Sequence, residues 1–302
     1  MSPPGLIITD LDGTLLDSRG RVSARNRAAL HAARQAGWHV AIATGRTWAE
    51  SHHATDAIAE EAFFIGAGGA SLHEAGSGRV LATHTLNAPL VCQLAHQIIQ
   101  HGHRAHLLLD PSVAGHDYLF VGTAELDPAT QWWLEAHPIS ARDWHALPQD
   151  AHQHLDDRVL RVGTIGADDD LRALSSTLLD LHGPALTLRQ WCALTPDEAI
   201  RAKEKTHMLE IFARGVDKWT MATEIATRLG LHHTQTVALG DGLNDLDLVR
   251  NAGLGVAMGN ADPRIAAVAQ QRTATNEEDG VAVAIERLLD GTWSVPGRTL
   301  AL

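Results

Sequence analysis

Four aspartates that follow two apolar segments are the residues most able to do chemistry in this sequence. Asp10 and Asp12 lie in LIITDLDGT, and Asp241 and Asp245 lie in TVALGDGLND. Like charges one residue apart repel each other and lose hydration when enclosed, so we expect a cation to hold Asp10 and Asp12 together. Mg²⁺ binds to a few carboxylates together with phosphate oxygens and water. The pattern therefore predicts a Mg²⁺ site.

Small polar residues and one lysine suggest that phosphate binds beside the metal. Gly13 and Thr14, like Thr44 in ATGR, offer backbone N–H groups and hydroxyls that suit phosphate oxygens. Lys218 is one of three lysines among 24 basic residues, so its position favours a need for a compact ammonium group rather than a planar guanidinium. An ordinary solvated lysine at the start of a helix is the alternative interpretation of Lys218.

The elements that would position these residues alternate between strand and helix in both terminal parts of the chain. This alternation predicts a doubly wound α/β domain, in which ligands bind at the carboxyl ends of parallel strands. The four aspartates are then expected to share one crevice. The predicted strands span 6–10, 38–44, 62–67 and 236–242, and the predicted helices span 23–36, 47–59, 219–229, 243–251, 262–269 and 279–290.

The middle of the chain breaks this alternation. A helix that begins after Asn87, an antiparallel hairpin around DPSVAGHD and a helix over 168–182 predict a mixed α+β insertion. A chain of 302 residues is long enough for two domains. We therefore expect a core domain formed by 1–83 and 207–302, and a cap domain formed by 84–206.

Composition argues against several classes of protein. The formal net charge of -12 disfavours nucleic acid and anionic membranes as partners. No apolar stretch approaches the ~20 residues of a membrane helix, and no signal peptide is recognisable. Cys92 and Cys192 imply no disulfide framework, and the 19 histidines show no zinc-binding spacing. These features favour a cytoplasmic enzyme, expected as a monomer or homodimer.

Four segments in order, DLDGTLL, ATGR, GVDKW and GDGLNDLDLVRNAGLGVAMGNA, resemble the motifs of the haloacid dehalogenase-like phosphohydrolases. AMGNADPRIAAVA and TNEEDGVAVAI narrow the resemblance to the Cof-type branch, and the match covers residues 5–83 and 205–290 well. The resemblance implies a Rossmann-like core with an inserted cap. It also implies a Mg²⁺-dependent phosphatase that acts on a small phosphorylated metabolite through an aspartyl phosphate.

The resemblance also implies catalytic roles for individual residues. Asp10 would be the nucleophile, and Asp12 would be the general acid and then the general base. Aspartate two residues after the nucleophile is typical of phosphatases and phosphomutases within the superfamily. Thr44 and Lys218 would bind the transferring phosphoryl group, with Lys218 also shielding Asp10.

The ligands of the metal and of the substrate follow in the same way. Asp10, the backbone carbonyl of Asp12 and Asp241 would hold Mg²⁺, with Asp245 in or just behind the first coordination shell. The residues expected to contact the substrate are Gly45, Arg46 and Asn244. For Arg46, an ion pair at the start of the following helix is an equally good interpretation.

The sequence does not identify the substrate. Relatives of this type act on sugar phosphates, pyridoxal phosphate, flavin precursors and nucleotides, and Gly68 replaces an asparagine that they usually carry in this loop. A phosphomutase and a non-catalytic regulator remain alternatives to a phosphatase. The insertion residues that we consider for substrate contact, although packing roles are commoner, are His116, Asp117, Arg189 and Trp191.

Overall fold

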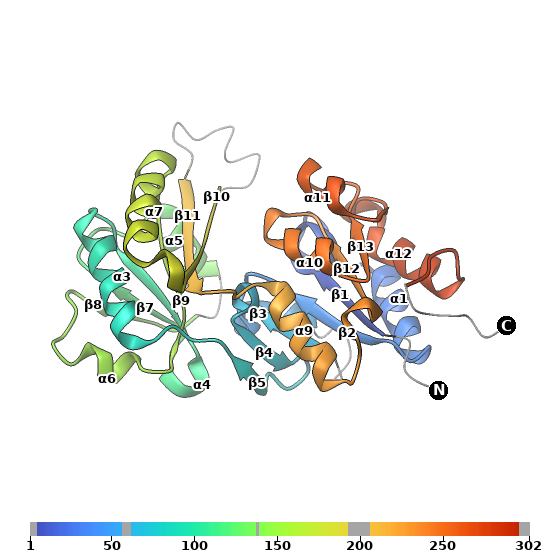
Figure 1. Ribbon diagram of the computed structural model, residues 1–302, viewed down its shortest axis with the longest axis horizontal. Helices are drawn as coiled ribbons and strands as arrows, with labels where there is room; N and C mark the ends of the chain where they lie inside the picture. Colours follow the sequence, from blue (N-terminus) through green and yellow to red (C-terminus); the bar gives the residue numbers. More distant parts are fainter. Residues whose placement is uncertain (1–4, 56–61, 137–138, 193–205, 296–302) are drawn as a thin grey trace. The chain divides into compact units, whose positions relative to one another are not determined.

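The structure, a computed structural model, describes residues 5–55, 62–136, 139–192 and 206–295. These residues belong to two compact units, each with its own sheet (Figure 1). Unit 1 comprises Met1–Ala82 and Asp217–Leu302, and unit 2 comprises Thr83–Val216. Within the described ranges, no helix is both long and apolar enough to cross a membrane.

The sheet of unit 1 has eight strands in the order β14-β13-β12-β1-β2-β3-β4-β5. β1 lies between β12 and β2 and pairs in parallel with both, so the carboxyl ends of these three strands meet at one edge of the sheet. The strands are β1 Leu6–Asp10, β2 His39–Ala43, β3 Phe63–Gly66, β4 Ser71–Glu74, β5 Val80–Thr83, β12 Thr236–Gly240, β13 Leu254–Ala257 and β14 Gln271–Arg272.

Helices cover both faces of this sheet, which confirms the predicted doubly wound fold. Leu30 of α1 and Ile285 of α12 pack with Ile7 on one face, whereas Met221 of α9 packs with Ile8 on the other. Alternate residues of β1 thus enter two separate cores, which explains its continuous apolar sequence. The helices of unit 1 are α1 Ala24–Gln35, α2 Trp48–Thr55, α9 Lys218–Arg228, α10 Leu246–Asn251, α11 Pro263–Val268 and α12 Gly280–Leu289.

Capping side chains fix where the important helices begin. The Ser23 hydroxyl accepts a hydrogen bond from the Asn26 N–H at 3.0 Å, and the Asp217 carboxylate accepts one from the Thr220 N–H at 2.7 Å. Such caps satisfy backbone donors that have no partner within the helix. The predicted helix over 47–59 is α2, and its last predicted residues, from 56 onward, lie outside the described residues.

The sheet of unit 2 has six strands in the order β10-β11-β9-β6-β7-β8. Its apolar core lies where α3 and α7 pack on one face of the sheet (Figure 1). The predicted hairpin is the antiparallel pair β6 and β7. The strands are β6 Ala105–Leu109, β7 Tyr118–Val121, β8 Ala141–Trp144, β9 Val159–Ala167, β10 Leu186–Cys192 and β11 Thr206–Ala213; the helices are α3 Ala88–Gln100, α4 Pro111–Ala114, α5 Pro128–Ala136, α6 Ala151–Leu155 and α7 Asp168–His182.

The second crossing between the units differs from the sequence-based boundary at residue 207. The chain returns to unit 1 between Val216 and Asp217. The reason is that β11, which includes residue 207, pairs along its length with β9 and β10 of the second sheet. Both of its partners are strands of the insertion, so β11 belongs to unit 2.

Candidate active site

A buried ammonium group organises the carboxyl edge of the unit 1 sheet. The Lys218 Nζ donates hydrogen bonds to Asp10 Oδ1 at 2.5 Å and to Asp245 Oδ1 at 2.6 Å. The Lys218 side chain has no exposed surface. Burial alone would lower the pKa of Lys218, but the two carboxylates outweigh burial and raise it, so the group stays charged. The alternative of a solvated lysine is therefore wrong.

Tight backbone packing fixes the position of Lys218 at the start of α9. Ala67, Gly68 and Gly69 all have positive φ angles, and Gly69 lies against the chain just before the lysine. A Cβ atom on Gly69 would lie 2.1 Å from the Asp217 carbonyl oxygen. Gly68, which replaces the expected asparagine, donates its N–H to the Thr44 carbonyl at 2.9 Å. This glycine loop therefore links the end of β2 to the lysine.

Asp241 and Asp245 differ in what their oxygens already bind. Asp241 Oδ1 accepts a hydrogen bond from the Thr14 hydroxyl at 2.8 Å. Asp245 Oδ2 accepts the N–H groups of Asp241 and Gly242, each at 3.1 Å, while its Oδ1 binds Lys218. Since both oxygens of Asp245 are engaged, this residue orients the loop and the lysine, whereas Asp241 keeps an oxygen for a further partner.

Three carboxylates lie close enough together to hold a metal ion. One oxygen from each of Asp10, Asp241 and Asp245 lies within 4.8 Å of the others. Burial, followed by the charge of Asp245, raises the pKa of Asp10 well above its usual value, although Lys218 opposes this effect. Burial likewise raises the pKa of Asp241 to about 6, although the Thr14 hydrogen bond opposes it. Three anions beside one ammonium leave an excess of negative charge that suits a divalent cation.

Asp12 is not one of these three carboxylates and forms an ion pair with Arg46. The Arg46 Nε donates to Asp12 Oδ2 at 2.9 Å, and its Nη2 donates to Asp12 Oδ1. Thr44 is buried at the end of β2, where its hydroxyl accepts the N–H of Arg46 at 3.2 Å. Arg46 is therefore paired with Asp12, a residue of the turn that follows β1.

Gly45 and Asn244, which the sequence predicts to contact the substrate, take no part in the contacts described above. A Cβ atom on Gly45 would have no described heavy atom within 4 Å, and the exposed Asn244 lies in the turn between Asp241 and Asp245. One positioning residue was missed, because the Asn260 amide donates to the Gly13 carbonyl at 2.8 Å. The conspicuous sequence AMGNA was the available signal for it.

Comparison with known proteins agrees with this geometry. The family model for haloacid dehalogenase-like hydrolases matches residues 7–285. The chain belongs to this family. The resemblance of its four motifs to the haloacid dehalogenase-like phosphohydrolases is thus confirmed.

Two relatives that are named as phosphatases match this haloacid dehalogenase-like hydrolase over most of their length. The chain is 28% identical over 283 residues to a 5-amino-6-(5-phospho-D-ribitylamino)uracil phosphatase of Bacillus subtilis, covering 92% of this chain and 95% of that protein. It is 30% identical to an HMP-PP phosphatase of Cronobacter sakazakii, covering 85% of each. A solved haloacid dehalogenase-like hydrolase from Bacteroides thetaiotaomicron superposes with a TM-score of 0.74 at 26% identity, covering 94% of this chain and 98% of that one.

The insertion residues considered for substrate contact have mostly structural partners within unit 2. Asp117 Oδ2 accepts the N–H and the hydroxyl of Ser140 at 2.9 and 2.7 Å. Arg189 donates to the Val216 carbonyl at 3.2 Å, and His116 Nδ1 lies 2.9 Å from the Ala114 carbonyl. Trp191 differs, since it is 46% exposed while its indole N–H donates to Glu210.

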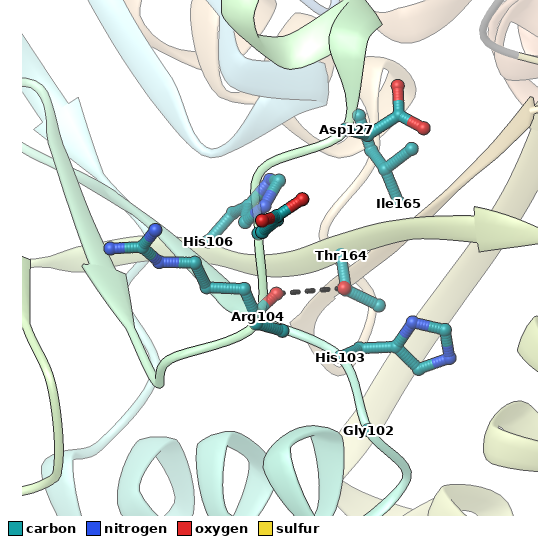
Figure 2. A pocket seen from close by; sticks show the side chains of 9 residues that line it. Gly102, His103, Arg104, His106, Asp127, Thr164 and Ile165 are labelled. Atoms are coloured by element: carbon teal, nitrogen blue, oxygen red, sulfur yellow. Dashed lines mark hydrogen bonds between the residues drawn. The ribbon is translucent and has the colours of Figure 1, made fainter.

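Unit 2 also contains a polar pocket of about 170 Å³ (Figure 2). The Thr164 hydroxyl donates a hydrogen bond to the Arg104 carbonyl across its wall at 2.8 Å. None of the residues predicted from the family motifs lines it, so this pocket is distinct from the carboxylate cluster of this haloacid dehalogenase-like hydrolase. Its lining residues are Gly102, His103, Arg104, His106, Ala124, Glu125, Asp127, Thr164 and Ile165.

Proposed function

We propose that this haloacid dehalogenase-like hydrolase is a Mg²⁺-dependent phosphomonoester hydrolase that works through an aspartyl phosphate. One observation carries the proposal: the Asp10 carboxylate ends the central strand β1, buried against Lys218 and beside two further carboxylates. A nucleophile fixed in this way needs little reorganisation to reach phosphorus, and phosphoryl transfer depends mainly on positioning and charge neutralisation.

The chain's own residues supply two balanced steps. A carboxylate oxygen of Asp10 forms a bond to phosphorus while the ester oxygen leaves, and Asp12 gives that oxygen a proton. Asp12 then removes a proton from a water molecule, whose oxygen displaces Asp10 from phosphorus and releases inorganic phosphate. Lys218 balances negative charge on the phosphoryl oxygens, and the Thr44 hydroxyl donates a hydrogen bond to one of them.

The donor set fits a magnesium ion, because Asp10 and Asp241 offer hard carboxylate oxygens within 4.8 Å of each other. Asp10, Asp241 and the carbonyl of Asp12 would hold the ion, with Asp245 behind them because its oxygens are engaged. When bound, Mg²⁺ supplies positive charge to the phosphoryl oxygens.

The substrate class rests on the relatives. The Bacillus subtilis relative is named for 5-amino-6-(5-phospho-D-ribitylamino)uracil and the Cronobacter relative for HMP-PP. These two compounds therefore come first in a panel of small phosphorylated metabolites that also contains sugar phosphates and pyridoxal phosphate. The expected result is a preference of at least tenfold in kcat/KM for one chemical class.

The test of the reaction itself is phosphate release from p-nitrophenyl phosphate, with Mg²⁺ and after chelation. We expect turnover only with Mg²⁺, and no turnover by Asp10→Asn in either condition. Equal rates with and without metal contradict the proposed metal. Transfer of the phosphoryl group to a second hydroxyl of the substrate, in place of release, favours the phosphomutase alternative.

We further propose that unit 2 is a cap that controls the access of substrate to Asp10. Hydrolysis in two steps requires that the substrate is enclosed and that the product is then released. Small-angle X-ray scattering with Mg²⁺ and orthovanadate tests this role. A smaller radius of gyration with both additives is expected, and an unchanged value contradicts cap closure. A cytoplasmic location and a monomer or homodimer remain predictions from the sequence.

A further inference from the structure

The pairing of Arg46 with Asp12 is the feature of unit 1 that the proposed reaction does not yet explain. Arg46 engages both carboxylate oxygens of Asp12, at 2.9 Å from Nε to Oδ2 and through Nη2 to Oδ1. A guanidinium fork that binds a carboxylate through two parallel hydrogen bonds fixes the plane of that carboxylate. A single ammonium contact would leave the plane free to rotate.

Arg46 is held more firmly than the carboxylate it binds. Its N–H donates to the Thr44 hydroxyl at 3.2 Å, and its carbonyl accepts the Ala67 N–H at 2.8 Å. The Arg46 side chain is 23% exposed, whereas the Asp12 side chain is 50% exposed. Asp12 itself lies in a turn, just before Gly13 with its φ of 76°. The arginine is therefore the anchor and the aspartate is the group being oriented.

We propose that Arg46 is a positioning residue, which orients the Asp12 carboxylate for proton transfer, and is not a ligand of the substrate phosphate. An ionised carboxylate has about four lone-pair positions, and the arginine uses two of them. A proton held at one of the remaining positions can pass to the leaving oxygen, and the carboxylate left behind can then take a proton from water. Arg46 keeps all its protons throughout.

This inference rests on the proposed function, because it assigns Asp12 the role of acid and base. The pair is partly exposed, so its removal should leave the fold intact. The pair matters because it sets the position of the Asp12 carboxylate. General acid catalysis contributes about 10²–10⁴-fold to the rate, and misplacement of a catalytic group by about 1 Å can cost about 10²-fold.

The experiment compares kcat and KM for p-nitrophenyl phosphate, whose leaving group needs little protonation, and for n-butyl phosphate, whose leaving group needs it. For Arg46→Met we expect kcat to fall about 10–100-fold with n-butyl phosphate, to change little with p-nitrophenyl phosphate, and KM to stay close to that of the parent for both. Arg46→Lys should recover part of the loss. The matched control is Arg25→Met, which removes a similar two-bond pair with Glu286 on the surface and should change neither rate.

A double variant separates action through Asp12 from independent action. Asp12→Asn combined with Arg46→Met should lose no more n-butyl phosphate turnover than Asp12→Asn alone. Additive losses overturn the inference. So does a KM that rises equally for both substrates, which indicates phosphate binding by Arg46, and so does faster n-butyl phosphate turnover in Arg46→Met, which indicates an inhibitory contact.

Failure of the proposed function gives a different result. If the parent protein releases phosphate from neither substrate, the proposed reaction is wrong and the role of Arg46 falls with it. If the parent is active and Asp12→Asn discriminates between the substrates while Arg46→Met does not, only the role of Arg46 is overturned.

Discussion

Among the described residues, each unit contains deeply buried side chains of opposite charge in contact, and the two groups differ in charge balance. In unit 1, Lys218 contacts Asp10 and Asp245, with Asp241 close by. In unit 2, the Arg161 and Glu210 side chains, 6% and 7% exposed, pair with each other. Burying charge costs free energy unless partners compensate for it. Unit 1 thus has three carboxylates close to one ammonium group, and in unit 2 one guanidinium pairs with one carboxylate.

The surroundings of the two pairs follow this difference. The pair in unit 2 has neutral hydrogen-bond partners, since the Tyr118 hydroxyl accepts a hydrogen bond from Arg161 at 3.0 Å and the Trp191 indole N–H donates one to Glu210 at 3.0 Å. In unit 1, burial and neighbouring carboxylates raise the pKa of Asp10 instead. The excess of buried carboxylates in unit 1 therefore indicates a site that needs another cation.

The largest effect should come from removing the buried cation of each unit. Lys218→Met leaves buried carboxylates without their ammonium, so unit 1 should lose about 3–5 kcal/mol of stability, and phosphate release should fall at least about 10²–10³-fold. Arg161→Met should destabilise unit 2 by a similar amount and spare p-nitrophenyl phosphate turnover. Hydrogen exchange resolved by unit, with turnover measured where both variants are folded, checks this. Loss of turnover in folded Arg161→Met would contradict a purely structural role for the buried pair of unit 2.

A second contrast concerns two glycines with positive φ, one in each unit. In Gly69→Ala the new Cβ would overlap the Asp217 carbonyl beside Lys218, so we expect a loss of about 2–4 kcal/mol from strain and overpacking together with reduced turnover. Gly215 of unit 2, at φ 75°, has open space around it. Gly215→Ala should cost only about 1–2 kcal/mol, from backbone strain alone. Urea denaturation measures both, and equal costs would argue against tight packing at the lysine.

Metal should stabilise the unbalanced unit selectively. MgCl₂ at about 100 times its Kd should add about 2.7 kcal/mol to the stability of unit 1, and this gain should vanish in Asp241→Asn. The pKa of Asp241 is about 6, so protons compete with the metal below that pH, and the gain should be smaller at pH 5 than at pH 7.5. Thermal denaturation with and without MgCl₂ provides the measurement. Asp247→Asn, which changes an exposed carboxylate on α10, is the control that should keep the full gain.

A further contrast is a pH dependence of opposite sign in the two units. Burial, aided by Arg161, lowers the pKa of His106 in unit 2 to about 3. Between about pH 6.5 and 3 the unfolded chain binds a proton that the folded unit does not, so acidification should destabilise unit 2 by about 1.4 kcal/mol per pH unit. In metal-free unit 1, Asp10 and Asp241 have raised pKa values. There the folded state holds the extra protons, and acidification through the same range favours folding.

Urea titrations at pH 4.5 and 6.5, followed by hydrogen exchange of each unit, test these signs. His106→Gln should remove most of the slope in unit 2 and leave that of unit 1 unchanged. A slope that persists in the variant would assign the acid sensitivity of unit 2 to other groups, such as His103, whose pKa burial also lowers.

The carboxylate cluster could be predicted because it depends on strand order and not on fine packing. Asp10 and Asp241 follow β1 and β12, which are parallel neighbours, so their side chains had to meet. The doubly wound core followed from apolar strands alternating with amphipathic helices. Lys218 was recognised by its residue type and motif, yet its complete burial depends on the three residues with positive φ in the loop after β3.

Other features depend on contacts that no local pattern reveals. The pairing of Arg46 with Asp12 joins two loops through side-chain conformations. The engagement of both Asp245 oxygens depends on how the turn before α10 folds back, and that turn also delays the helix predicted from 243 until Leu246. The return to unit 1 after Val216 depends on the distant partners of β11. The contacts between Arg46 and Asp12, between Asp245 and Lys218, and between β11 and β9 are long-range consequences of tertiary packing.

The separation of Asp10 from Lys218 in the chain also affects the order in which the two units can fold during synthesis. The two residues are 208 positions apart, and all of unit 2 is made between them. At about 5–20 residues per second, the ribosome needs roughly 10–40 s to pass from one to the other. During that interval β1 has neither β12 beside it nor an ammonium group for its terminal carboxylate. Unit 2 is one continuous segment of the chain, so its sheet can form before the second half of unit 1 has been synthesised. Unit 2 can therefore finish folding before unit 1.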